Sequence, residues 1–315
     1  MKIKKKHFYA IVVIALVLAV AAFYYASPLQ KSKNIEETAG KNEQTSWMVD
    51  ENGYLSYPLD RGNVLFNRQN YDETDNLTIS KIIYQSRNGN IYGLLVLPKS
   101  ASNLMPGIVL LPGAGVGKES ELYLAKKIAL LDAAVLTIDQ RGVGETGGNV
   151  NSIKEDYLDF LNSKEPTQHI MVYDALRAYD LLHDAPFVDP DRIIIAGESL
   201  GGRIAIIAAA IDRNIKGVLA ISSSGLDFKE INDTKVNAFL KSIDSDHYVG
   251  LITPRKLVMI HSLNDSIIPL NSAITSYSKA HEPKAFVLVN DTSCNHGYCD
   301  SMYNGLVEGL KFVLS

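Results

Sequence analysis

The sequence predicts an α/β fold built on a doubly wound, mostly parallel sheet. From Ile79 to the end of the chain, short β-branched apolar runs alternate with longer amphipathic segments, which is typical of strands and crossover helices in one sheet. In addition, the apolar run 193–195 leads through a glycine-containing turn into an Ala/Ile-rich segment. Ligands of such sheets bind beyond the carboxyl ends of the strands, so the loops at those ends are the candidates for a functional site.

The expected elements follow one another in a regular order. A turn at Asn88-Gly89-Asn90 joins the first two strands as a hairpin. The expected strands are 81–85, 91–97, 108–111, 134–138, 193–195, 218–221, 256–260 and 286–289, and the expected helices are 121–131, 167–183, 203–211 and 301–314. The stretch 226–253 is partly helical and rich in Asp and Lys, which indicates a small cap. Residues 79–315 are therefore expected to form a single domain that includes this cap.

The first 26 residues form a separate segment. Four lysines precede an uninterrupted apolar run from Phe8 to Ala26, about 19 residues and close to the length that crosses a bilayer. Lysines on that side place the N-terminus in the cytoplasm and the body outside it. Ala19-Val20-Ala21 also fits a signal-peptide cleavage site. We expect a membrane anchor, with secretion after cleavage as the alternative, and an exported body in either case.

Two further segments and the charge complete the outline. Residues 27–46 are polar and predict a solvated stalk, and residues 47–78 are expected to form an N-terminal extension packed on the main domain. Without the four N-terminal lysines, 27 of the 31 basic residues remain against 35 acidic ones, a formal charge of −8. An acidic body offers no electrostatic footprint for nucleic acid, so no nucleic-acid partner is expected.

The segment Gly197-Glu198-Ser199-Leu200-Gly201 contains the pattern G-x-S-x-G. Between a strand and a helix, this pattern forms a sharp turn that exposes the serine hydroxyl as a nucleophile. The glycines allow the strand and the helix to approach closely. The alternative is an ordinary glycine-rich connection with an incidental serine. The flanking strand and helix favour the nucleophile, and Ser199 is therefore the predicted catalytic residue.

Several motifs together resemble the α/β-hydrolase superfamily, in particular its dienelactone hydrolase, acetyl-xylan esterase and prolyl-oligopeptidase-like branch. The matching segments are 112–115 (Pro-Gly-Ala-Gly), 139–144 (Asp-Gln-Arg-Gly-Val-Gly), 189–192 (Asp-Pro-Asp-Arg), 197–202, 261–269 and 295–297 (Asn-His-Gly). The resemblance covers most of residues 79–315. It implies an α/β-hydrolase fold with a small cap, and a serine hydrolase with a Ser-His-Asp triad.

A serine hydroxyl needs a base and an orienting carboxylate, and in this fold their order along the chain is Ser, Asp, His. Asp265 follows the strand 256–260, and Asp227, after the preceding strand, is the second candidate for the acid. His296 follows the last strand and is the expected base. His261 precedes the acid and is expected to be structural.

An acyl-transfer site also needs two backbone N–H donors for the oxyanion. One is expected from Leu200, directly after the nucleophile, and the other from Ala114, with Gly113 and Gly115 as neighbouring possibilities. The glycine-rich stretch lacks the Gly-Lys-Ser/Thr ending of a nucleotide-binding loop. We expect no cofactor and no metal. The resemblance implies that Asp139 and Arg141 brace the floor of the site.

Cys294 and Cys299 are the only cysteines and lie on either side of His296. In an exported protein they predict one disulfide, with two free cysteines as the alternative. The predicted activity is hydrolysis of a small carboxylic ester through an acyl-enzyme. A serine peptidase or an acyltransferase of the same fold remains an alternative, as does a non-catalytic membrane-anchored binding protein.

Overall fold

The computed structural model describes residues 47–100 and 104–315. The membrane anchor predicted in residues 1–26 and the stalk predicted in residues 27–46 lie outside the described residues. Within the described ranges, no helix is both long and apolar enough to cross a bilayer.

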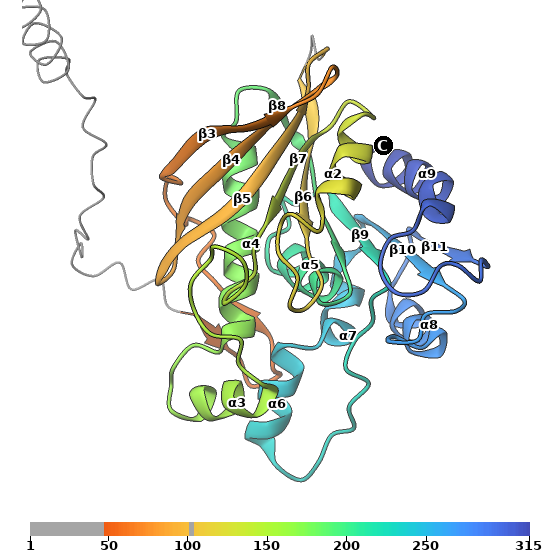
Figure 1. The fold of residues 1–315 in the computed structure, drawn as a ribbon. Helices are drawn as coiled ribbons and strands as arrows, with labels where there is room; N and C mark the ends of the chain where they lie inside the picture. The colour runs from red at the N-terminus through yellow and green to blue at the C-terminus, as the bar shows by residue number, and fades with distance from the viewer. Residues whose placement is uncertain (1–46, 101–103) are drawn as a thin grey trace, which may run out of the picture. The chain divides into compact units, whose positions relative to one another are not determined.

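Figure 1 shows a nine-stranded sheet with helices on both faces. Its strand order is β11-β10-β9-β8-β6-β7-β5-β4-β3. The strands from β11 to β7 in this order run parallel, whereas β5, β4 and β3 are antiparallel to their neighbours. The strands are β3 (Phe66–Glu73), β4 (Leu77–Ser86), β5 (Gly89–Pro98), β6 (Met105–Leu111), β7 (Ala134–Ile138), β8 (Val188–Glu198), β9 (Gly217–Ile221), β10 (Lys256–Ser262) and β11 (Lys284–Val289). The mostly parallel sheet predicted from the sequence is confirmed.

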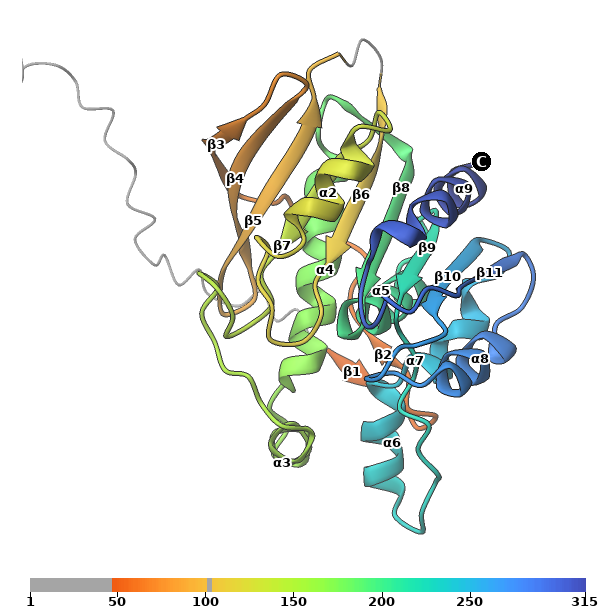
Figure 2. The same cartoon turned by 45° about the vertical axis from the view of Figure 1, so that its right-hand side comes forward.

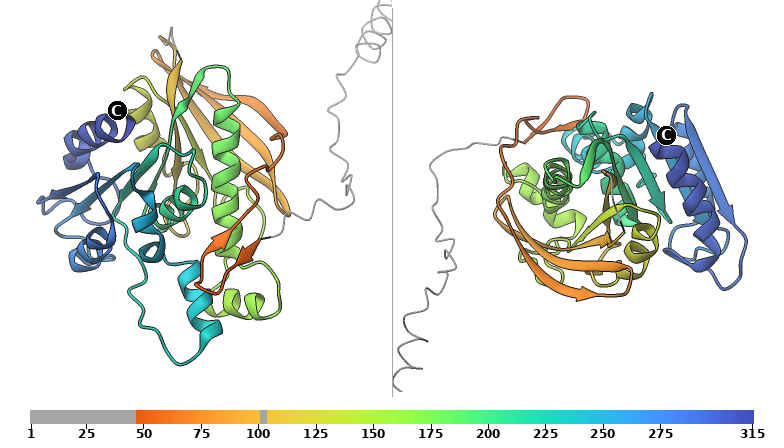
Figure 3. Two further views of the ribbon diagram at one scale, coloured as in Figure 1. Left: turned by 180° about the vertical axis from the view of Figure 1, so that it is seen from behind. Right: turned by 90° about the horizontal axis from the view of Figure 1, so that it is seen from above.

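The helices form two layers, which Figures 2 and 3 show from other sides. The remaining elements are α2 (Leu122–Ala129), α3 (Ile153–Leu161), α4 (Thr167–His183), α5 (Leu200–Ile211), α6 (Thr234–Ser242), α7 (Ser245–Tyr248), η1 (Val249–Ile252), α8 (Leu270–Lys279), η2 (Asp300–Met302) and α9 (Tyr303–Leu314), with a two-stranded sheet of β1 (Met48–Val49) and β2 (Leu55–Ser56). One apolar core lies between the sheet and α4 and α5. A second lies between the opposite face and α2 and α9. Strands buried on both faces explain why the central runs are apolar throughout.

Two stretches differ from the expected outline. The stretch 47–78, expected as an extension, contributes β3 and the first residues of β4 to the main sheet. All eight residues of β3 are exposed, so the strand shows no apolar alternation in the sequence. The stretch expected as a cap contains α6, α7 and η1. Helix α6 packs on α3 through Phe239, whose ring lies 5.5 Å from Tyr157 and 5.6 Å from Phe160 between centroids.

Candidate active site

Ser199 occupies the tight turn between β8 and α5. Its backbone has φ +52° and ψ −116°, a region that residues other than glycine rarely adopt and that costs about 1–3 kcal/mol. The turn is held by the Ser199 N–H donating to the Ile221 carbonyl (2.9 Å) and by the Ser223 hydroxyl donating to the Ser199 carbonyl (2.8 Å). The structure therefore places the strained serine at the carboxyl ends of the neighbouring strands β8 and β9.

Glycine is required on both sides of the serine. A Cβ at Gly197 would lie 2.4 Å from the Gly201 carbonyl carbon, and one at Gly201 would lie 2.1 Å from the Leu111 carbonyl oxygen. Real Cβ atoms do not approach other atoms this closely, so a side chain at either position would push α5 away from β8 and β6. The close approach anticipated from the sequence motif is present.

The loops after β10 and β11 bring Asp265 and His296 together. His296 Nδ1 lies 2.9 Å and 3.0 Å from the two carboxylate oxygens of Asp265. Because an ionised carboxylate only accepts hydrogen bonds, Nδ1 carries the proton and Nε2 is left as an acceptor. The Asp265 side chain is fully buried, whereas that of His296 is 24% exposed. Asp265 thus orients the imidazole through Nδ1, while the ring remains partly accessible, as a general base requires.

The environment of Asp265 favours its ionised form. Burial by itself would raise the pKa of this carboxyl, but the Ile268 N–H, the His296 ring and the Ile267 N–H outweigh burial and hold the pKa below its usual value. The two amides donate to Oδ1 at 2.8 Å and 3.0 Å. Asp265 is therefore expected to stay charged, and its contribution to stability should be lost only as the pH falls through this lowered pKa.

Of the other two candidates, Asp227 lies apart from this pair, whereas His261 Nε2 lies 3.8 Å from Asp265 Oδ2. Asp227 is exposed, with φ +49°, and forms no hydrogen bond or ion pair with His296 among the described residues. His261 is 1% exposed, and its Nε2 lies 2.9 Å from the Ile268 carbonyl oxygen. It supports the same loop that holds Asp265, in agreement with the structural role expected for it.

The histidine loop packs directly on the serine turn. The Tyr298 N–H donates to Glu198 Oε2 at 3.2 Å, and the Ser222 hydroxyl donates to the Gly297 carbonyl at 3.5 Å. Within the described residues, the Ser199 hydroxyl has no hydrogen-bond partner. In ligand-free hydrolases such contacts are often long and tighten only with substrate. The serine, the imidazole and the buried carboxylate therefore share one end of the sheet.

The glycine-containing loop after β6 lies beside the serine. A Cβ at Gly113 would lie 3.6 Å from Ser199 Cβ. The adjoining Ala114 is exposed, and Leu200 is the first residue of α5, so its amide is one of the free donors at a helix N-terminus. The two backbone groups predicted for the oxyanion thus belong to segments that adjoin Ser199.

Asp139 and Arg141 brace the surrounding loops. Asp139 accepts from the backbone N–H groups of Lys118 (2.8 Å) and Glu145 (2.9 Å), and from Lys118 Nζ (2.9 Å). Arg141 forms a two-point ion pair with Asp174, both contacts being 2.7 Å long. Lys118 is fully buried, a role that sequence reasoning missed. In the sequence, Lys118 follows a glycine-rich stretch, where a lysine is usually exposed to solvent.

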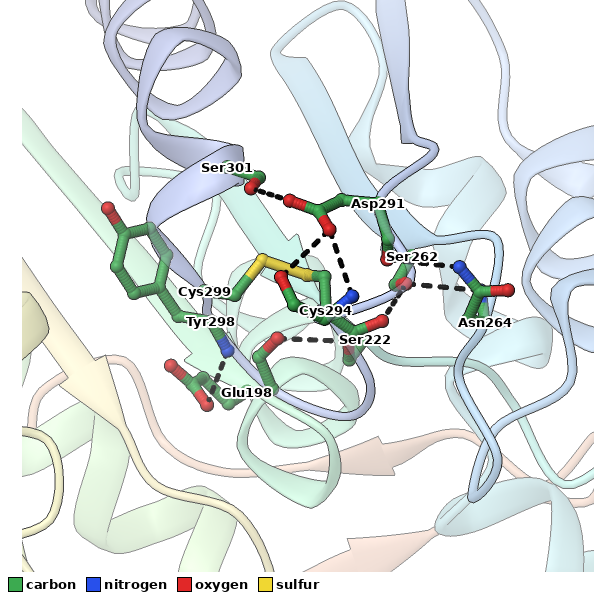
Figure 4. Close-up of a disulfide and its surroundings, with 11 residues drawn as sticks. Glu198, Ser222, Ser262, Asn264, Asp291, Cys294, Tyr298, Cys299 and Ser301 are labelled. Atoms are coloured by element: carbon green, nitrogen blue, oxygen red, sulfur yellow. Dashed lines mark hydrogen bonds between the residues drawn. A yellow bond between two sulfur atoms is a disulfide. The ribbon is translucent and has the colours of Figure 1, made fainter.

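Cys294 and Cys299 form a disulfide, as predicted, and close the loop that carries His296 (Figure 4). The Cys294 carbonyl accepts a hydrogen bond from the Ser262 hydroxyl (2.6 Å), and the same hydroxyl accepts from the Asn264 N–H (3.1 Å). Ser262 thus links the histidine loop to the loop of Asp265. The described residues contain no cluster of His, Cys, Asp or Glu able to hold a metal ion.

Removing the disulfide should impair catalysis more than it impairs folding. A loop this short confers roughly 2 kcal/mol of stability by the chain-entropy estimate, which corresponds to a decrease in Tm of roughly 4–8 °C for a domain of this size. We expect a Cys294→Ala/Cys299→Ala variant to remain folded at 25 °C and to lose several-fold in kcat. Ser293→Ala, in the same loop, is the control. An unchanged kcat in the double variant would show that the bridge does not hold His296 in place.

Comparisons with known proteins bear on the family and the fold of the chain. A sequence model of the family described as Acetyl xylan esterase (AXE1) matches residues 62–247. The uncharacterized protein YfhR of Escherichia coli O157:H7 is 28% identical over 178 residues, which are 52% of this chain and 62% of YfhR. The uncharacterized protein Rv2307c of Mycobacterium tuberculosis is 23% identical over 216 residues, 66% of this chain and 69% of that protein. The chain thus spans less than two thirds of the length of YfhR.

Among solved structures, an acetyl xylan esterase from Paenibacillus sp. R4 superposes with a TM-score of 0.66 at 21% identity, covering 80% of this chain and 89% of that one. A glucuronoyl esterase from Solibacter usitatus superposes with a TM-score of 0.62 at 15% identity, covering 85% and 90%. At these identities the likeness concerns the fold, which is that of the α/β-hydrolases.

Proposed function

Because the chain belongs to the acetyl xylan esterase (AXE1) family, we propose that it is a serine esterase that cleaves short-chain carboxylic esters, with acetyl esters as the first candidates. The observation that carries the proposal is the oriented His296–Asp265 pair, whose loop packs on the strained turn of Ser199. A residue held in a costly backbone conformation beside an oriented base is typical of a catalytic nucleophile.

In the proposed mechanism, the Ser199 hydroxyl attacks the ester carbonyl while His296 Nε2 takes its proton. The backbone N–H groups of Ala114 and Leu200 stabilise the negative oxygen of the tetrahedral intermediate. The intermediate then collapses as the imidazolium gives its proton to the departing alcohol oxygen, which leaves an acyl-Ser199 ester. Water then attacks that ester while His296 Nε2 takes its proton. The second tetrahedral intermediate collapses as the imidazolium returns this proton to Ser199 Oγ, which releases the carboxylic acid and restores the serine. Asp265 keeps the imidazole in the required tautomer throughout.

We further propose that the body works outside the cytoplasm. The disulfide supports this location, because disulfides persist mainly in oxidising compartments. The lysine-flanked apolar run 8–26 supports attachment to a membrane or export through it. Fractionation of cells that express the full chain tests this: recovery of the reduced protein in the cytosol would contradict it.

The activity is tested on the full chain. Acetyl, butyryl and octanoyl p-nitrophenyl esters measure acyl-chain preference. Acetylated xylan tests whether the protein acts on the substrate for which the family is named. We expect kcat/KM to be highest for the acetyl ester. Product analysis with added alcohols separates hydrolysis from acyl transfer. If a folded protein hydrolyses none of these esters, the esterase proposal is wrong.

A further inference from the structure

Two glutamates next to the catalytic turn are not used by the mechanism above. Glu198 immediately precedes Ser199 at the end of β8, and Glu121 immediately precedes α2. Glu121 is 3% exposed, and Glu198 is partly buried. Among the described residues, neither forms an ion pair, and Glu121 Oε2 is buried without a hydrogen-bond partner. A buried acid and a partly buried acid that pair with no cation need an explanation, because a buried unpaired charge is costly.

Each carboxyl contacts one of the loops that complete the site. Glu198 Oε2 accepts the Tyr298 N–H in Figure 4. A Cβ at Gly297, where φ is +80°, would lie 2.7 Å from this oxygen, so the carboxyl rests directly on the backbone that follows His296. Glu121 interacts with the backbone N–H of Gly113, in the loop proposed to hold the oxyanion.

The surroundings of Glu121 and Glu198 determine the charge that these two carboxyl groups carry. Burial, and then the negative charge of Glu198, raise the pKa of Glu121 to about 9, although the Gly113 amide acts in the opposite direction. Burial also raises the pKa of Glu198, against the Tyr298 amide and the charge of His296. At neutral pH the pair is therefore expected to hold a single negative charge, with the proton on Glu121, because two like charges in one buried site cannot both ionise cheaply.

We propose that Glu121 and Glu198 act as a carboxylic acid–carboxylate pair that positions the loop of Gly113 and the loop of His296 on either side of Ser199. Both are positioning residues and neither touches the reacting atoms. The effect on turnover rests on the proposed esterase function. When Glu121 loses its proton, the two carboxylates repel one another and the two loops separate, so activity should fall at alkaline pH.

The test uses Glu121→Gln, because glutamine resembles the protonated acid in shape and hydrogen bonding. The kcat/KM for p-nitrophenyl acetate, corrected for spontaneous hydrolysis, is followed from pH 6 to pH 10. The parent should lose activity with a midpoint near pH 9. Glu121→Gln should stay within about threefold of the parent at pH 7 and lose this alkaline decline. Glu198→Gln should also remove the alkaline decline, because Glu121 then ionises with no second carboxylate to repel it.

Glu119→Gln is the matched control. Glu119 lies two residues before Glu121, its side chain is half exposed and it pairs with Lys118, so its replacement should leave the alkaline decline where it is. If the profiles of Glu121→Gln and the parent superimpose, the proposal is overturned.

Thermal unfolding tests the protonation without any substrate. An acid whose pKa is raised in the folded protein keeps a proton that it has lost in the unfolded chain. Such an acid lowers the free energy of unfolding as the pH rises from 4.5, its pKa in the unfolded chain, to about 9. The parent should therefore lose Tm over this range relative to Glu121→Gln. Parallel curves would overturn the proposal even if the protein proved to have no esterase activity, and diverging curves would support the acid pair independently of that activity.

Discussion

Ser199→Ala is expected to lower kcat for p-nitrophenyl acetate by at least about a thousandfold, because it removes the atom that forms the acyl-enzyme. Alanine at φ +52° is no less strained than serine, and the Ser199 hydroxyl makes no hydrogen bond within the described residues. The Tm of the variant should therefore stay within about 2 °C of the parent, since a substitution that removes no contact changes stability little.

The control is Ser278→Ala on α8, which removes an exposed hydroxyl that bonds only the Thr275 carbonyl. It should keep the activity of the parent. A Ser199→Ala variant that remains folded and retains more than about a tenth of the parent kcat would contradict the nucleophilic role.

Asp265→Asn is expected to lower kcat by about a thousandfold to ten-thousandfold. The asparagine carbonyl could still accept from Ile267 and Ile268, but its amide group would donate to His296 Nδ1. That contact would shift the imidazole proton to Nε2, the atom that must accept the serine proton. The loss should therefore appear in kcat, with KM and the fold largely preserved.

The matched control for this change is Asp227→Asn. Asp227 is also an acid after a sheet strand, and its left-handed backbone suits asparagine equally well. It should change kcat by less than about twofold. Comparable losses of kcat from both substitutions would show that the loss of one negative charge, and not the contact of Asp265 with His296, lowers the rate.

The central part of the site could be predicted because its signals are local. The turn at Ser199 combines a buried strand, two glycines and an apolar helix within a single short stretch, and the helix predicted at 167–183 has the same bounds as α4. The preference for Asp265 over Asp227 rests partly on the family pattern, because both acids lie between Ser199 and His296 in the sequence. Only the structure brings Asp265 within hydrogen-bond distance of His296.

Other elements were missed for physical reasons. Strand β3 is exposed along its whole length, so hydrophobic periodicity could not reveal it. Helix α3 begins with a capping box in which Ser152 and Glu155 bond one another's backbone N–H. The S-x-x-E pattern is present in the sequence, but the apolar residues Ile153, Leu158 and Leu161 are exposed, so the helix has no core-facing apolar stripe of the usual kind.

The role of Glu121 could have been suspected from its position. Leu124, Ala125 and Ile128 form the buried stripe of α2, and Glu121 precedes them at the same helical spacing. A carboxyl on an apolar stripe indicates a special environment. Glu198 could not be found in this way, because its electrostatic interaction with Glu121 joins residues that are far apart in the sequence.

The most direct test of the esterase account is labelling of the folded protein with a fluorophosphonate, followed by mass spectrometry of its peptides. The account predicts one adduct, on Ser199, formed at a rate that falls sharply in the Asp265→Asn variant and absent from Ser199→Ala. An adduct on another residue, or no adduct on a folded protein, would contradict the assignment of Ser199 as the nucleophile.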